Sequence, residues 1–269
     1  MKTYHFLAGL PRSGNTLLSA ILNQNSQVFS SPISPVLNMV WNHDNFSTTE
    51  ESVRRLENKN QILNYGENII VNYYKDIDKP IIIDREKCWA TTGNLNLLKK
   101  YITPTPKIIF TVRPVLEILA SWINILPKDS FIDKEMINTG WWHKDYLTIN
   151  DNRCDYLMHP SGQINKTLFS INEIIKPENK NIFCLIKYDD LINAPQNTMD
   201  KIYDFLELPT YKHNFNKIKK IEKDNDEEIG LPTNLHDIRP RLKKISQDPK
   251  KVLSKYIIDK YSNIGWEGL

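Results

Sequence analysis

Cysteine is scarce in this chain of 269 residues. The three cysteines, Cys88, Cys154 and Cys184, are an odd number, widely spaced and without a CxxC pair. A disulfide framework needs an even set and a zinc site needs clustered ligands, so the pattern argues against both. Free thiols of this kind are typical of a protein in a reducing compartment.

Long apolar runs are also missing. The first run, residues 4–10, is too short for a signal peptide and leads directly into a turn that contains glycine. No stretch approaches the roughly 18 apolar residues of a membrane-spanning helix. We therefore expect a cytoplasmic protein without a membrane span.

The excess of positive charge is small, because 35 Lys and Arg face 32 Asp and Glu to give a net charge of +3. Domains that bind nucleic acid usually carry a basic stripe or a much larger excess, so we expect no nucleic-acid partner. A small anionic ligand is still compatible with this balance. Arginine is the rarer cation, at positions 12, 54, 55, 85, 113, 153, 239 and 241.

Short apolar runs alternate with segments of helical periodicity, a pattern typical of βαβ units and a parallel sheet. The pattern predicts an α/β fold of three layers, with a central, mostly parallel sheet flanked by helices, in a single domain over residues 1–269. Strands are expected at 4–8, 80–84, 107–112 and 181–186, and helices at 16–24, 94–101, 115–125 and 196–206.

Two less regular segments, residues 41–79 and 126–160, are expected to be insertions that cover the substrate side of the sheet. The first predicts helices near 49–63 and 66–74. The second has no obvious strand and carries Trp141, Trp142 and Tyr146. These aromatic side chains could line a pocket for a sugar or an aromatic acceptor, or form a small satellite core.

The segment between the first strand and the first helix has the spacing G-x-x-x-x-G-x-[ST], from Gly9 to Thr16, which is typical of a phosphate-binding loop. Glycines at both ends allow a tight turn that points N–H groups at an anion, and the following helix adds its positive dipole end. Asn15 stands where nucleotide hydrolases have lysine, and the cation sits earlier, at Arg12. The loop therefore suits an anion other than a magnesium-bound triphosphate.

Residues 11–17, Pro-Arg-Ser-Gly-Asn-Thr-Leu, resemble the 5′-phosphosulfate-binding loop of the P-loop sulfotransferases. The form with arginine is similar to that of tyrosylprotein sulfotransferases and related bacterial enzymes. The resemblance implies 3′-phosphoadenosine 5′-phosphosulfate (PAPS) as sulfonate donor, the desulfated nucleotide PAP as product, and no metal. It implies these donor-binding residues in the loop: Arg12, Ser13, Gly14, Asn15, Thr16 and Leu17.

A second element agrees with this resemblance. Arg113 follows a predicted strand, and Ser121 comes eight residues later, slightly over two turns along the next helix. The family's 3′-phosphate site has this pair, in which a guanidinium and a hydroxyl hold one phosphate. Two weaker similarities nominate Tyr188 near the adenosine and Arg239 in a loop that closes over the donor.

For catalysis, the resemblance implies that Arg12 neutralises charge on the bridging oxygen and that Arg85 holds the sulfonate. The tyrosylprotein enzymes have a glutamate base in the region that reads Phe-Ser-Ser-Pro-Ile-Ser-Pro here, at residues 29–35, where no carboxylate occurs. We rank Glu86 first as the general base. The alternatives are Asp84, His43 and His143.

The sequence thus predicts a sulfotransferase that acts on a hydroxyl or amine of a small-molecule, glycan or peptide acceptor. Two alternatives stay open. A P-loop kinase of small molecules would use Asp84 for magnesium, and a nucleotide-binding module without activity would explain the missing glutamate. The sequence leaves the oligomeric state open.

Overall fold

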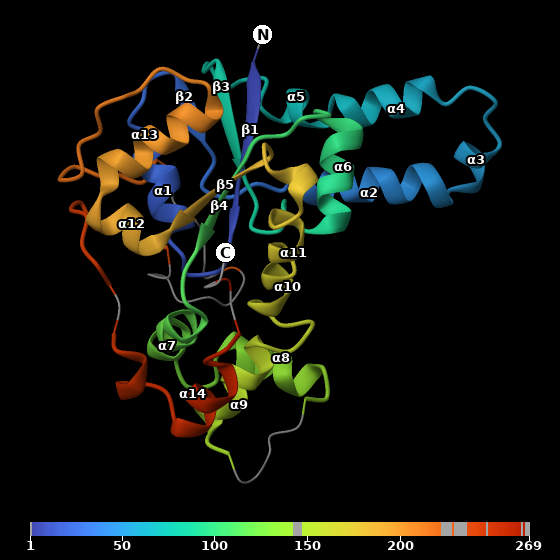
Figure 1. Ribbon diagram of the computed structural model, residues 1–269. Helices are drawn as coiled ribbons and strands as arrows, with labels where there is room; N and C mark the ends of the chain where they lie inside the picture. The colour runs from blue at the N-terminus through green and yellow to red at the C-terminus, as the bar shows by residue number, and fades with distance from the viewer. Residues whose placement is uncertain are drawn as a thin grey trace.

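A computed structural model describes residues 2–141, 147–221, 228, 236–245, 247–264 and 266. Its centre is a sheet of five strands in the order β2-β3-β1-β4-β5, and all four neighbouring pairs are parallel (Figure 1). The predicted α/β class with a parallel sheet is confirmed. The strands are β1 (Thr3–Gly9), β2 (Val28–Ser30), β3 (Ile81–Arg85), β4 (Ile108–Val112) and β5 (Phe183–Lys187).

Four strands lie within about two residues of their predicted bounds. Differences of this size are usual where the ends of strands and helices are assigned. The sequence prediction missed β2. This strand has only three residues and pairs at the edge of the sheet through Val28 and Ile81. A strand of this length is too short to show an alternating apolar pattern.

Helices cover both faces of the sheet, as predicted for a three-layer fold. Alternate residues of β1 enter two separate apolar clusters, Phe6 on one face and Leu7 on the other. Leu7 packs on the side of α1 (Asn15–Leu22) and α13 (Pro195–Leu206), and Phe6 on the side of α6 (Thr92–Tyr101). The parallel sheet is therefore buried on both faces.

The segment 41–79 forms most of four helices: α2 (Val36–Thr49), α3 (Glu51–Arg54), α4 (Asn60–Glu67) and α5 (Ile69–Tyr73). In Figure 1, α2, α3 and α4 form an arm that projects to one side, and α5 lies next to the sheet. Helical structure was predicted near 49–63, and the structure divides it between α3 and the start of α4. The chain breaks after α3, where the side chain of Asn58 accepts a hydrogen bond from the N–H of Asn60 at 2.9 Å. A local bond of this kind competes with helical hydrogen bonds, and α4 begins at Asn60 as a helix separate from α3.

The segment 126–160 contains α8 (Phe131–Asn138) and α9 (Ile149–Leu157), beyond the carboxyl ends of the strands. Each begins with a capping box, formed by Ser130 with Asp133 and by Thr148 with Asp151. Both pairs have the three-residue spacing that is typical of the start of a helix.

The C-terminal part returns to this group of helices. Helix α14 (Lys255–Tyr261) packs on α9 and on α7 (Val115–Ile125), and Lys260 and Tyr261 both donate hydrogen bonds to the buried Asp155. The remaining short helices are α10 (Asn165–Leu168), α11 (Ile171–Ile174), η1 (Pro177–Asn179), α12 (Tyr188–Asn193) and η3 (Pro249–Lys251). In the part of the chain that the structure describes, none of the helices combines the length and the apolar character that a membrane crossing needs.

Candidate functional site

The loop between β1 and α1 needs both of its glycines. A Cβ atom at Gly9 would lie 2.2 Å from Thr111 Oγ1, because β1 passes close to β4 there. Gly14 begins α1 in a left-handed conformation (φ +93°), where a Cβ would lie 3.1 Å from the ring of Tyr188. Among the described residues, α1 has no side-chain cap and no acidic residue in its first turn. Its first N–H groups are thus presented to an anion.

Asn15 and Ser13 brace this loop from inside. The Asn15 side chain donates to the Leu10 carbonyl at 3.1 Å and accepts from the Thr111 hydroxyl at 2.8 Å. Ser13 is fully buried, and its hydroxyl bonds the same Leu10 carbonyl and contacts Thr111. Asn15 therefore ties the loop to β4 at the position where a nucleotide hydrolase has its lysine. The Ser13 hydroxyl points away from the cavity, which differs from its expected contact with phosphate.

Arg12 is the cation of the loop. Its backbone lies in the left-handed region (φ 60°), which costs roughly 1–2 kcal/mol in a residue other than glycine. Arg12 Nε donates to Ser121 Oγ at 3.2 Å, which joins the loop to α7. Burial and then the nearby charge of Arg113 lower the pKa of Arg12. An anion placed between the two guanidinium groups would relieve this repulsion.

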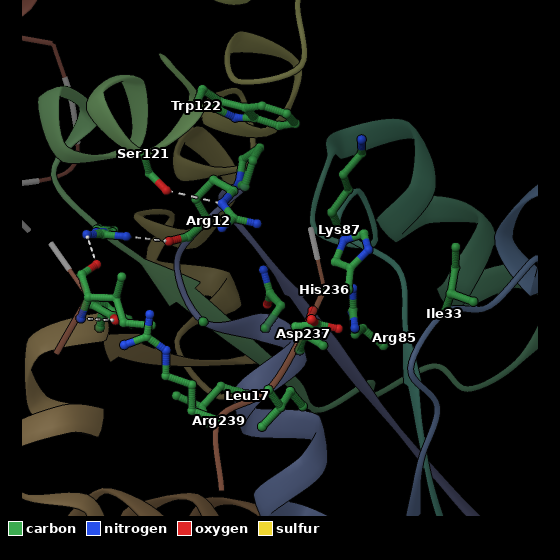
Figure 2. Close-up of a pocket in the computed structure, with 18 of the residues that line it drawn as sticks. Arg12, Leu17, Ile33, Arg85, Lys87, Ser121, Trp122, His236, Asp237 and Arg239 are labelled. Carbon is green, nitrogen blue, oxygen red and sulfur yellow. Dashed lines mark hydrogen bonds between the residues drawn. The ribbon is translucent and has the colours of Figure 1, made fainter. Parts of the chain in front are cut away.

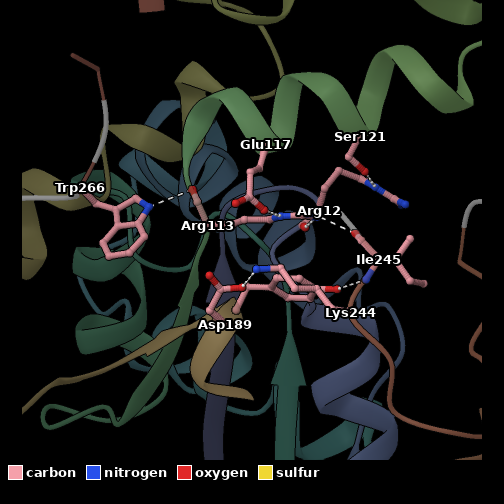
Figure 3. A network of polar contacts seen from close by, with 9 residues as sticks. Arg12, Arg113, Glu117, Ser121, Asp189, Lys244, Ile245 and Trp266 are labelled. Atoms are coloured by element: carbon pink, nitrogen blue, oxygen red, sulfur yellow. Dashed lines mark hydrogen bonds and ion pairs between the residues drawn. The ribbon is translucent and has the colours of Figure 1, made fainter. Parts of the chain in front are cut away.

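Arg113, the second predicted anchor, is 4% exposed at the end of β4 (Figure 3). Its Nε donates to Glu117 at 3.0 Å, one Nη donates to the Arg12 carbonyl at 3.0 Å, and the other donates to the Ile245 carbonyl at 3.1 Å. The ring of Tyr188 lies 4.4 Å from its guanidinium carbon. One side chain thus connects β4, α7, the loop and a segment near the C-terminus.

The C-terminal contacts of this network were not predicted. The indole Nε1 of Trp266 donates to the backbone carbonyl of Arg113 at 2.8 Å, in a buried position. Strand β4 ends at Val112, just before Arg113 and Pro114, and Trp266 satisfies the buried carbonyl of Arg113 beyond the strand end. Lys244 pairs with Asp189 at 2.7 Å, at the start of α12. Sequence spacing cannot reveal a partner 153 positions away.

A cavity of about 600 Å³ joins these groups at the carboxyl ends of the strands (Figure 2). Ligands of open α/β sheets bind at this edge. All of the predicted site residues except Ser13 line it: Arg12, Gly14, Asn15, Thr16, Leu17, Arg85, Glu86, Arg113, Ser121, Tyr188 and Arg239.

The same cavity has lining residues that sequence reasoning missed. Trp122 and Phe131 form an aromatic pair with ring centroids 6.1 Å apart. Glu135 lies one helical turn after Phe131 on α8, within the second predicted insertion. Lys87 donates to the side chain of Gln163, and both line the cavity. None of the lining residues comes from 41–79, a segment that the structure describes in full.

The structure separates the four candidate bases. Glu86 lines the cavity. Asp84 does not: it is fully buried below the strand end, where Ser34, Tyr74 and Trp89 all donate to its carboxylate. Burial raises the pKa of Asp84. Its role is thus to hold the core, and it is removed from the candidates for base and for a magnesium ligand.

The two histidine candidates also lie elsewhere. His43 is on α2, packed against Tyr65 and Tyr101, and burial lowers its pKa. It is absent from the described lining of the cavity. His143, together with Trp142 and Tyr146, falls outside the described residues. His236 and Asp237, which belong to the same predicted loop as Arg239, line the cavity from the C-terminal segment.

Three solved structures have a similar fold. A sulfotransferase domain from the curacin biosynthetic pathway is 18% identical, with a TM-score of 0.52, and the match covers 98% of this chain and 93% of that one. The sulfotransferase domain of the Synechococcus PCC 7002 olefin synthase is 16% identical, with a TM-score of 0.52 and coverage of 98% and 89%. Retinol dehydratase in complex with androsterone and the inactive cofactor PAP is 11% identical, with a TM-score of 0.51 and coverage of 100% and 80%.

At these identities the likeness establishes the fold. No curated protein matches the sequence. A sequence model of the sulfotransferase family matches residues 5–212, which is well over half of the chain and includes both phosphate motifs. Since the match runs from β1 past α13 and the two motifs meet in one cavity, the chain belongs to the sulfotransferase family, and its activity is the PAPS-dependent transfer of a sulfonate group.

Proposed function

We propose that this enzyme transfers the sulfonate in line from PAPS to the hydroxyl of its acceptor. The twelve site residues predicted from the sequence lie in the cavity lining or, for Ser13, directly behind it. The observation that carries this proposal is the hydrogen bond between Arg12 and Ser121. It brings the 5′-phosphosulfate loop and the 3′-phosphate motif, 109 positions apart, to one wall of one cavity.

The chemistry of the lining fits the donor. N–H groups of Gly14, Asn15 and Thr16 at the start of α1 would hold the 5′-phosphate, as helix N-termini do for phosphates generally. Arg113 and Ser121 would hold the 3′-phosphate. In this conformation three of the five N–H groups of Arg113 already bond Glu117, Arg12 and Ile245, so it is fixed in place before any nucleotide arrives.

Tyr188, which lies beside Arg113, and Arg239 both line the cavity, and we assign them to the nucleoside. Tyr188 stacks on the guanidinium of Arg113 and accepts a hydrogen bond from the Ile245 N–H at 3.4 Å. Its ring therefore forms a fixed platform at the side of the donor.

In the proposed reaction, the acceptor oxygen forms a bond to sulfur while the bond from sulfur to the bridging oxygen breaks. The bridging oxygen keeps the electron pair and leaves on PAP, where Arg12 stabilises its charge. The acceptor proton passes to the carboxylate of Glu86. Arg85, beside it on the cavity wall, holds the sulfonate oxygens during transfer.

Isothermal titration calorimetry tests the assignment of the donor site. We expect wild-type protein to bind PAP and to prefer it to ATP with magnesium. Arg12→Ala should weaken PAP binding at least about tenfold, because a charge-assisted contact is lost. Arg55→Ala is the matched control, since the Arg55 side chain is 78% exposed on the arm and pairs at the surface with Glu51. Preference for ATP would contradict the proposal.

The two alternatives have less support. A kinase would need a magnesium ligand, and Asp84, the residue nominated for it, is occupied by three donors in the core. A module without activity would need the cavity to lack a base, whereas Glu86 and Glu135 both line it.

Several finer predictions remain proposals. We propose one domain over residues 1–269, supported by the bond from Trp266 to Arg113. We also propose a cytoplasmic protein, supported by its three free thiols, and transfer without a metal, which unchanged activity in EDTA would test. The likeness of the loop to tyrosylprotein sulfotransferases is still a prediction from the motif alone.

A further inference from the structure

The cavity has a second half that the donor does not explain. If the 5′-phosphate lies at the start of α1, as in the proposed function on which this inference rests, in-line attack requires the acceptor on the far side of the sulfonate. In Figure 2, Trp122 lies on the opposite side of Arg12 from Leu17 and Arg239. The residues around Trp122 therefore form the wall that an acceptor would meet.

This wall is aromatic. Trp122 is 7% exposed and packs against Phe131 at an angle of 58° between ring planes. Ile33, which is 62% exposed, lines the mouth of the same cavity. Large exposed apolar side chains at the edge of a pocket gain free energy when an apolar ligand covers them, by about 25 cal/mol per Å² of area.

The aromatic wall is held firmly. Helix α8, which carries Phe131 and Glu135, is tied to α9 by a buried ion pair between Arg153 and Asp133 at 2.6 Å. Arg153 also donates to the carbonyl of Pro127 at 2.7 Å. A pocket wall fixed in this way pays little conformational entropy when a ligand binds.

The charge balance of the cavity decides what kind of ligand fits. Among the described residues, seven cationic and three carboxylate side chains line it, an excess of four positive charges with histidine neutral. The donor carries about four negative charges, since a phosphomonoester has nearly two and the phosphosulfate has two. The bound donor would therefore balance the whole excess of positive charge in the cavity.

The rest of the lining offers the acceptor no spare positive charge. With the donor bound, seven cationic side chains face three carboxylates and about four donor charges, so the cavity as a whole is close to neutral. A further anionic group on the acceptor would enter a site already neutralised by the donor and lined by the aromatic side chains of Trp122 and Phe131. Burial of such an unpaired charge is costly.

We propose that the acceptor is an uncharged alcohol or phenol with an apolar, aromatic or aliphatic, body, which packs against Trp122 and Phe131. Charged glycans and acidic peptides are excluded as preferred acceptors. Glu86 accepts the proton of the reacting hydroxyl, and the apolar body lies against the cavity faces of Trp122 and Phe131.

The first test compares acceptors that differ only in charge. With labelled PAPS, we expect 4-ethylbenzyl alcohol to have a kcat/KM at least about tenfold above that of 4-(hydroxymethyl)benzoate, since the carboxylate adds an unpaired charge. Benzyl alcohol, with less apolar area, should fall between the two. Transfer confined to the carboxylate or to acidic sugars, or no transfer to any uncharged alcohol, would overturn the inference.

The second test does not depend on turnover. Protein saturated with PAP is titrated with 4-ethylbenzyl alcohol by calorimetry. Phe131→Ala should weaken alcohol binding about tenfold and leave PAP binding unchanged, and Phe131→Leu should recover part of the loss. Ile137→Ala, on the same helix but 70% exposed and outside the cavity lining, is the control.

These tests separate the inference from the function beneath it. PAP binding with no effect of Phe131→Ala would overturn the acceptor class and leave the donor site standing. Failure of the wild-type protein to bind PAP would overturn the proposed function itself.

Discussion

Two regions of the chain meet at Arg113, and the sequence predicts one of them better than the other. The loop at residues 9–16 and the start of α7 lie inside the range that the family model matches, and their spacing is fixed by the strands and helices that carry them. The segment 236–266 lies beyond that range. It reaches the same arginine through the Ile245 carbonyl and the Trp266 indole. Part of the proposed donor site is thus formed by residues close together in the sequence, and the contacts that support it come from residues far away in the sequence.

The two regions differ in whether their side chains line the cavity. Arg12, Ser121 and the N-terminus of α1 line the cavity that we propose for the donor. Trp266 holds the backbone of Arg113 from behind and is absent from the described lining of the cavity. Changes in the first region should therefore weaken donor binding and slow the transfer, whereas changes in the second should weaken donor binding without altering the chemistry.

The largest effect is expected from Arg113→Ala. The substitution removes the guanidinium and leaves the Glu117 carboxylate unpaired beside the 3′-phosphate site, so we expect PAP binding to weaken at least about 100-fold. Calorimetry with PAP measures it, with Arg55→Ala as control. A loss of less than about threefold would mean that Arg113 only supports the fold.

Trp266→Phe should have the next largest effect. It keeps the ring in the core but removes the N–H, so the carbonyl of Arg113 is left without its partner at a cost of about 1–3 kcal/mol. We expect KM for PAPS and the dissociation constant of PAP to rise about tenfold, with kcat nearly unchanged. A lower melting temperature with unchanged PAP affinity would show a purely structural role.

Lowering the pH should reduce the free energy of unfolding through a residue that belongs to neither region. His5 lies in β1, and burial lowers its pKa from 6.5 to about 4. Because the unfolded chain binds this proton more readily, stability is full above about pH 6.5 and falls as the pH drops toward 4, by about 2 kcal/mol at pH 5. Urea unfolding at pH 7 and pH 5 measures the loss.

His5→Gln separates this contribution from the rest. The variant should lose less stability between these two pH values than the wild type does. An equal loss in both proteins would assign the effect to other groups, of which His213, also lowered to a pKa of about 4 by burial, is the first candidate.

The smallest effect is expected from Lys244→Ala. The ion pair between Lys244 and Asp189 lies near the surface, with both side chains over 40% exposed. Such pairs contribute roughly 0–1 kcal/mol, so PAP affinity should change less than about fivefold. The change should disappear at high salt, and a larger effect that survives salt would give this segment a direct role in donor binding.

Much of this site could be predicted because its parts are short motifs on regular elements. Gly9, Gly14 and Arg12 are set by the turn from β1 to α1, and Ser121 follows Arg113 on one helix. What could not be predicted depends on tertiary packing. The buried position of Asp84 follows from Tyr74 and Trp89 folding over it, although the strand ending Asp-Arg-Glu-Lys suggested an exposed charge cluster.

The acceptor half shows the same limit. Phe131 and Glu135 face the cavity because Arg153 of α9 fixes α8, and no spacing in the sequence reports that contact. The capping pair of Ser130 and Asp133 could have located the start of α8. It would not have shown which face of the helix lines the site.

The central claim is that this cavity moves a sulfonate, and single-turnover transfer from PAPS labelled in the sulfonate tests it most directly. With enzyme in excess over PAPS and 4-ethylbenzyl alcohol present, the account predicts that the label moves to the alcohol and that PAP forms in equal amount. Arg12→Ala should slow this step at least about 100-fold, because it stabilises charge that develops on the leaving oxygen. PAP binding of normal strength with no label on any acceptor hydroxyl would contradict the account.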